Sequence, residues 1–88
     1  MMYPYMTLAD ETEIVHSHLI EEEDVKKVEV HFERATEDGF DTARCSLPSY
    51  MWTIKEGFSD DEIDKFEIFL KNNAHLIYRF AENGAMMY

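Results

Sequence analysis

The alternation of apolar and polar side chains predicts two adjacent strands in the middle of the chain. Residues 25–33 and residues 40–47 each alternate with a period of two, as expected of a strand that buries one face. Residues 35–39 between them have the composition of a turn, so the two strands should form a hairpin. The apolar positions of the hairpin are Val28, Val30, Phe32, Ala43, Cys45 and Leu47.

Weaker patterns flank this hairpin on both sides. Residues 50–55 alternate again and predict a short third strand that ends before Gly57. Residues 12–20 fit either a short helix or a strand. The β-branched pair Ile14–Val15 favours the strand, as does the acidic stretch 21–24, which we interpret as a break that ends it. The sheet should therefore contain three or four strands.

A capping box marks the start of a long helix. Ser59 is suited to the N-cap position, and Glu62 three residues later completes the motif. Phe58 and Ile63 bracket the box as a hydrophobic staple. The helix should begin at about Asp60.

The helix continues to about Asn83, because apolar residues recur at spacings of three and four. Gly84 favours a left-handed C-terminal stop, and Asn72–Asn73 is the place where the helix could bend. The stripe expected to face the sheet consists of Ile63, Phe66, Phe69, Leu70, Ala74, Ile77, Phe80 and Ala81.

These elements predict one α+β domain over residues 1–88. An antiparallel three- to four-stranded meander carries one long C-terminal helix packed on one face, and the other face is left to solvent. Residues 1–9 and 85–88 are expected to be apolar tails that hold five of the six methionines. A length of 88 residues with 45% hydrophobic content suffices for one small core and excludes a second domain.

Charge narrows the range of partners. The chain has 19 acidic and 8 basic residues, a formal charge of −11, and residues 1–41 hold 12 of the acids. Coulomb repulsion disfavours direct binding to nucleic acid or to a membrane, so a partner should be a basic protein. No export signal or transmembrane segment is expected, and the single cysteine suits a reducing cytoplasm.

Catalytic or metal chemistry finds little support. His16 and His18 would share one face of a strand, and His31 with Glu29 could approach them to form a divalent metal site, but no dense ligand motif is present. Cys45 belongs to the inward side of its strand, where a thiol is a small hydrophobe. The acidic runs are surface carboxylates, so we expect a non-enzymatic protein with no catalytic residue, metal or cofactor.

The remaining candidates are binding surfaces. The aromatic cluster Tyr50, Trp52 and Phe58 is expected to be a core plug rather than a ligand groove, and the Met- and Tyr-rich tails could contact a partner. Homo-oligomerisation is left open. Carboxylates could also imitate the phosphates of nucleic acid and block a basic groove, as in small anti-restriction and anti-CRISPR proteins, which is an analogy of type and not of motif.

We therefore expect a small acidic protein that blocks or regulates a basic, nucleic-acid-binding partner. The alternative is a structural or adaptor subunit that associates through its apolar tails and a sheet edge. The residues expected to bind the partner are Asp10, Glu11, Glu13, Glu21, Glu22, Glu23, Asp24, Glu37, Asp38 and Asp41.

Overall fold

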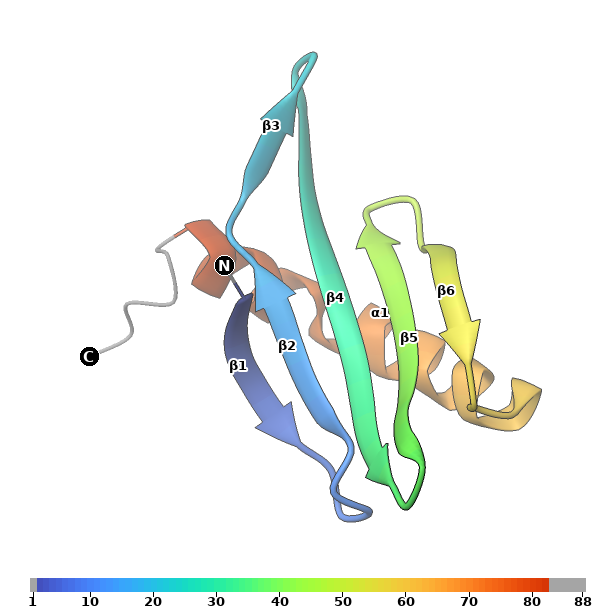
Figure 1. Ribbon diagram of the computed structural model, residues 1–88. Helices are drawn as coiled ribbons and strands as arrows, with labels where there is room; N and C mark the ends of the chain where they lie inside the picture. The colour runs from blue at the N-terminus through green and yellow to red at the C-terminus, as the bar shows by residue number, and fades with distance from the viewer. Residues whose placement is uncertain (1, 83–88) are drawn as a thin grey trace.

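The computed structural model describes residues 2–82, which form six strands followed by one long helix (Figure 1). All strand pairs are antiparallel, and the sheet order is β1–β2–β4–β5–β6. The short strand β3 pairs with the beginning of β4, on the same edge as β2. The elements are β1 (Met2–Thr7), β2 (Glu13–Ser17), β3 (Ile20–Glu22), β4 (Val25–Thr36), β5 (Gly39–Leu47), β6 (Met51–Glu56) and α1 (Asp60–Glu82).

The α+β class and the helix packed on one face of an antiparallel meander are confirmed, but three to four strands was too few. Residues 2–7, treated as part of an apolar tail, form β1 and pair with β2 despite Pro4. The acidic stretch 21–24, interpreted as a break, instead belongs to the β3–β4 hairpin. Neither segment alternates cleanly, so periodicity could not find them. Gly84 and the tail 85–88 lie outside the described residues.

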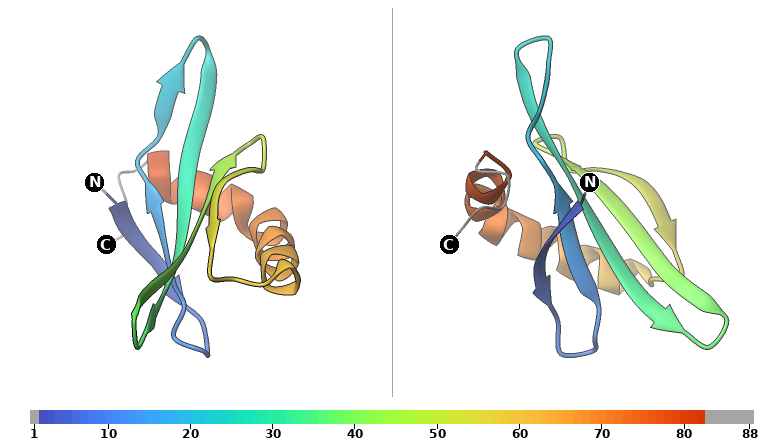
Figure 2. Two further views of the ribbon diagram at one scale, coloured as in Figure 1. Left: turned by 45° about the vertical axis from the view of Figure 1, so that its right-hand side comes forward. Right: turned by 60° about the vertical axis from the view of Figure 1, so that its left-hand side comes forward.

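The core lies between α1 and the sheet face that it covers, here called the inner face (Figure 2). The Phe32 and Phe66 rings stack with centroids 4.3 Å apart, and Phe58 meets Phe66 edge to face. Trp52 packs near Phe32 and donates from Nε1 to Glu67 Oε1 at 3.2 Å. These contacts agree with the core-plug interpretation. The buried apolar residues are Ile14, Val28, Val30, Phe32, Ala43, Cys45, Leu47, Phe58, Ile63, Phe66, Leu70, Ile77 and Ala81.

The helix begins as its sequence predicts. The Ser59 hydroxyl accepts from the Glu62 backbone N–H at 3.2 Å, and the Glu62 carboxylate accepts from the Ser59 N–H at 3.0 Å. The helix passes through Asn72–Asn73 without a break. Asn73 donates to the Phe69 carbonyl and accepts from the Tyr5 hydroxyl, so its polar side chain is satisfied. Within residues 2–82, no helix has the length and apolar character needed to cross a membrane.

The connection from β6 to α1 requires a glycine. Gly57 has a φ of +89°, a conformation that residues with a Cβ rarely adopt. A Cβ at this position would also collide with the Asp41 side chain. The close approach therefore keeps the start of α1 beside β5.

Both outer strands carry features that discourage pairing with another sheet. The β1 strand contains Pro4, which has no N–H to donate, and its register shifts between Pro4 and Met6. In β6 the register shifts at Thr53, and charged Lys55 and Glu56 follow. Proline, bulges and charges are the usual means by which proteins protect sheet edges.

Candidate partner-binding surface

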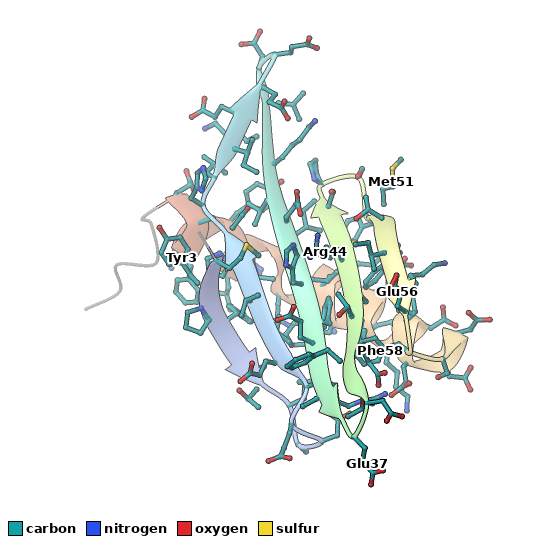
Figure 3. All side chains as sticks on the ribbon, viewed as in Figure 1. Tyr3, Glu37, Arg44, Met51, Glu56 and Phe58 are labelled. Atoms are coloured by element: carbon teal, nitrogen blue, oxygen red, sulfur yellow. The ribbon has the colours of Figure 1, made fainter. Side chains whose placement is uncertain are left out.

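The ten acids expected to bind a partner lie in two groups at opposite ends of the sheet (Figure 1). Residues 21–24 form the tip of the β3–β4 hairpin at one end. The other group surrounds the β1–β2 loop and the β4–β5 turn, where Glu37 and Asp38 are exposed (Figure 3). The molecule is 39 Å long, so one compact groove could not hold both groups.

The β3–β4 hairpin extends beyond the rest of the sheet (Figure 2), and residues 21–24 lie in this extension. Its turn consists of Glu23 and Asp24, whose φ angles are +48° and +68°. Two successive positive φ values are typical of a type I′ turn, which favours Asn and Gly. All four acids are exposed, and Glu22 is the one that pairs with a cation of the described chain, at 3.3 Å from Lys27 Nζ.

Two of the expected residues are occupied by an internal contact instead. Arg34 Nε and Nη2 donate to Asp41 Oδ2 at 3.0 and 2.7 Å, and Nη1 donates to Asp10 Oδ2 at 3.3 Å. Nη1 also donates to Glu62 Oε2 at 2.6 Å, and the guanidinium lies 4.6 Å from the centroid of the Phe58 ring. Asp41 and Asp10 thus help to join the sheet, the β1–β2 loop and the helix.

The open face, which is the sheet face opposite α1, adds carboxylates that are far apart in the sequence. Glu13 on β2 lies directly opposite Glu33 on β4, and Thr42 on β5 lies between Glu33 and Glu56 on β6. Like charges directly opposite one another destabilise a sheet. The alternation of residues 25–33 predicts a polar face on this strand, but the strand register is needed to align the row.

Next to this row lies Arg44, which has no acidic partner within residues 2–82. Arg44 is directly opposite His31 and Ile54 in the centre of the open face (Figure 3). Its Nε is buried and has no hydrogen-bond partner, and among the described residues no carboxylate lies within ion-pair distance of its guanidinium. His31 Nε2 lies 3.1 Å from Glu29 Oε1. The open face is therefore mixed in charge at its centre and acidic around it.

The histidines do not converge on a metal site. His16 points into the core and is fully buried, with Nδ1–H donating to the Ser17 carbonyl at 2.8 Å. His18 follows the end of β2 and is exposed, and His31 lies on the open face. Strand β2 ends at Ser17, so His16 and His18 do not share a strand face. No group of three metal-ligating side chains occurs within residues 2–82.

The thiol of Cys45 faces the core, as its strand pattern predicts. It is 1% exposed, and burial raises its pKa to about 12. A nucleophilic cysteine instead requires a lowered pKa and access to substrate.

Free carboxylates therefore remain at the hairpin tip, at the β4–β5 turn and across the open face. Glu11 and Glu13 add to the second group, since both are exposed. Comparisons with protein-family models, with curated proteins and with solved structures found no match to this chain.

Proposed function

We propose that this protein binds a basic protein partner of the kind that binds nucleic acid, in the cytoplasm, and blocks or regulates it without catalysis. Its carboxylates would occupy the site that normally receives phosphates. Arginines and lysines that contact a nucleic-acid backbone are suited to carboxylates as well, because both ligands offer anionic oxygens to the same donors.

The acidic β3–β4 hairpin is the observation that supports this proposal most. It places four consecutive carboxylates at an exposed tip, two of them at positive φ. Left-handed backbone costs a residue with a side chain about 1–2 kcal/mol, and adjacent like charges add repulsion. A two-residue hairpin needs these φ angles, but Asn and Gly would adopt them at lower cost, so the presence of Glu23 and Asp24 favours a role for their charge.

The adaptor alternative gains less from the fold. It relied on apolar tails and a sheet edge, yet residues 2–7 form strand β1 and are not a free tail. The protective features of β1 and β6, Pro4 and the two register shifts, weigh against edge pairing.

The proposal is tested with two charge-reversal variants, one at the hairpin and one elsewhere on the surface, which change the net charge by the same amount. A Glu22→Lys/Glu23→Lys variant and an Asp64→Lys/Glu82→Lys control each change the net charge by +4, and the four side chains replaced are all exposed. The partner is first captured by the parent protein from a cytoplasmic extract, and its affinity for each variant is then measured at 50 and 200 mM salt.

We expect the hairpin variant to lose most of its affinity at low salt while the control keeps it. A DNA duplex should compete with the parent protein for the partner. Binding that is insensitive to salt, or that DNA does not displace, would overturn the phosphate-mimic proposal.

A further inference from the structure

An apolar pocket lies beside the acidic hairpin. It has a volume of about 420 Å³ and is bounded by β4, by the end of β5 and by the turn that leads to β6. Residues of three strands and of the β5–β6 turn line it, among them Val25, Leu47, Pro48 and Met51. Its size falls within the range of pockets that hold small ligands or single side chains, roughly 300–1,000 Å³.

Two apolar side chains of this pocket are unusually exposed. Val25 is 43% exposed and Met51 is 63% exposed. Figure 3 labels Met51 beside the start of β6. Met51 is unbranched and polarisable, so it can adapt to the shape of a neighbouring group. A hydrophobic surface that residues 2–82 leave uncovered is available to another molecule.

Carboxylates border the pocket on two sides. Val25 directly follows Asp24 and is paired across the hairpin with Glu22. On the other side, Ser46 lines the pocket and is paired with Glu29. Lys27, the one cation of the lining, is held by Glu22 at 3.3 Å.

The net charge of this region decides which class of occupant it suits. Residues 20–29 contain five acids and two lysines, a formal charge of −3. An anionic lipid or a nucleic acid would be repelled, whereas lysine or arginine side chains would be attracted to the border. The apolar lining then requires a hydrophobic group between those cations.

We propose that this pocket receives one apolar side chain, such as leucine, from a basic segment of the partner, while flanking lysines or arginines contact Glu22, Asp24 and Glu29. The inference rests on the proposed function and sharpens it. The partner surface is a basic peptide segment with a hydrophobic anchor, and not a purely electrostatic groove. Burial of one leucine side chain should tighten binding by about tenfold to a hundredfold.

Three synthetic peptides test the pocket directly. Their sequences are Lys-Lys-Leu-Lys-Lys, Lys-Lys-Ser-Lys-Lys and Glu-Glu-Leu-Glu-Glu, and binding is followed by NMR of the valine and methionine methyl groups. The leucine-containing basic peptide should shift the Val25 and Met51 signals and bind at least about tenfold more tightly than the serine peptide. The acidic peptide should not bind.

Two single substitutions test whether the preference for the leucine peptide arises in this pocket. Met51→Gln should abolish the preference for leucine over serine. The matched control Met6→Gln, at another exposed methionine of an outer strand, should retain it.

The results separate the two proposals. If both basic peptides bind equally and Glu22→Lys/Glu23→Lys removes that binding, the pocket inference fails while the acidic-surface proposal stands. If the acidic peptide binds as well as the basic one, the pocket recognises apolar groups alone and the charge argument is wrong. If neither basic peptide binds, the pocket inference is overturned.

Discussion

A 2.6 Å hydrogen bond joins the Arg34 guanidinium to the carboxylate of Glu62, 28 residues further along the chain. Glu62 also accepts from the Ser59 N–H within the capping box. One carboxylate therefore serves both the start of α1 and its attachment to β4. Arg34 completes the connection by binding Asp41 on β5.

Replacing Arg34 should lower the stability of the fold more than replacing Arg44 on the open face. Arg34→Met leaves Asp10, Asp41 and Glu62 without their cation and should lower the free energy of unfolding by about 2–4 kcal/mol. Arg44→Met, on the open face, should change it by less than about 1 kcal/mol. Urea denaturation measures both, and equal effects would show that the Arg34 contacts contribute little.

The same contacts predict a dependence on pH. Arg34, together with the Ser59 N–H, holds the pKa of Glu62 below its ordinary value. Ionised Glu62 therefore stabilises the fold above the unfolded pKa of about 4.3, and this contribution is lost as pH falls through the lower folded pKa.

The stability difference between parent and Arg34→Met isolates this effect from the relief of charge repulsion at low pH, which both proteins share. The difference should be constant near neutrality and should shrink as the pH falls below about 4.3. Denaturation series at several pH values measure it. A difference that grows with acid would contradict the sign of the Glu62 shift.

Removing the helix cap should have a smaller effect. Ser59→Ala deletes the acceptor for the Glu62 N–H and should cost about 1 kcal/mol. Ser46→Ala on the open face, where the side chain caps no helix, is the control. Coincident thermal melts of Ser59→Ala and the parent protein would show that the cap is not needed.

The stacked pair at the centre of the core should carry more stability than any surface contact. Phe66→Ala removes the ring that stacks on Phe32 and should cost about 3–5 kcal/mol, enough to unfold the domain. Ile68→Ala, at a helix position that is 60% exposed, should be nearly neutral. Circular dichroism melts distinguish the two, and an unchanged melt for Phe66→Ala would place the core elsewhere.

The thiol should be unreactive while the protein is folded. Burial raises the pKa of Cys45 to about 12, so very little thiolate forms at pH 8. Labelling of Cys45 by a disulfide reagent should therefore be no faster than the transient unfolding that exposes the thiol, and it should become fast in urea. Rapid labelling of the native protein would contradict the inward orientation of this side chain.

Periodicity predicted the elements whose burial is one-sided and regular. Strands β4 and β5, β6 and the helix all follow from alternation or from the Ser59 motif. Strand β1 was not predicted, because its pairing with β2 and not its own pattern makes it a strand. The Glu23–Asp24 turn escaped because its residues are not those that such turns favour, and tertiary context overrides local preference.

The candidate site was predicted in composition but not in arrangement. Acidic residues were expected to face a partner, and seven of the ten make no ion pair within residues 2–82, whereas Asp10 and Asp41 bind Arg34 and Glu22 binds Lys27. Pairing of Arg34 with acids in three other segments is a long-range property that no local pattern carries. The alignment of Glu13 with Glu33 likewise depends on strand register.

The position of α1 in chain order has a consequence for synthesis of the protein. Every strand is translated before the helix that covers the inner face, so the nascent sheet presents Val30, Phe32 and Leu47 to its surroundings until α1 follows. At roughly 5–20 residues per second, the 23 residues of the helix take about one to five seconds to make. A chain truncated before α1 would therefore expose these apolar side chains and be prone to aggregation.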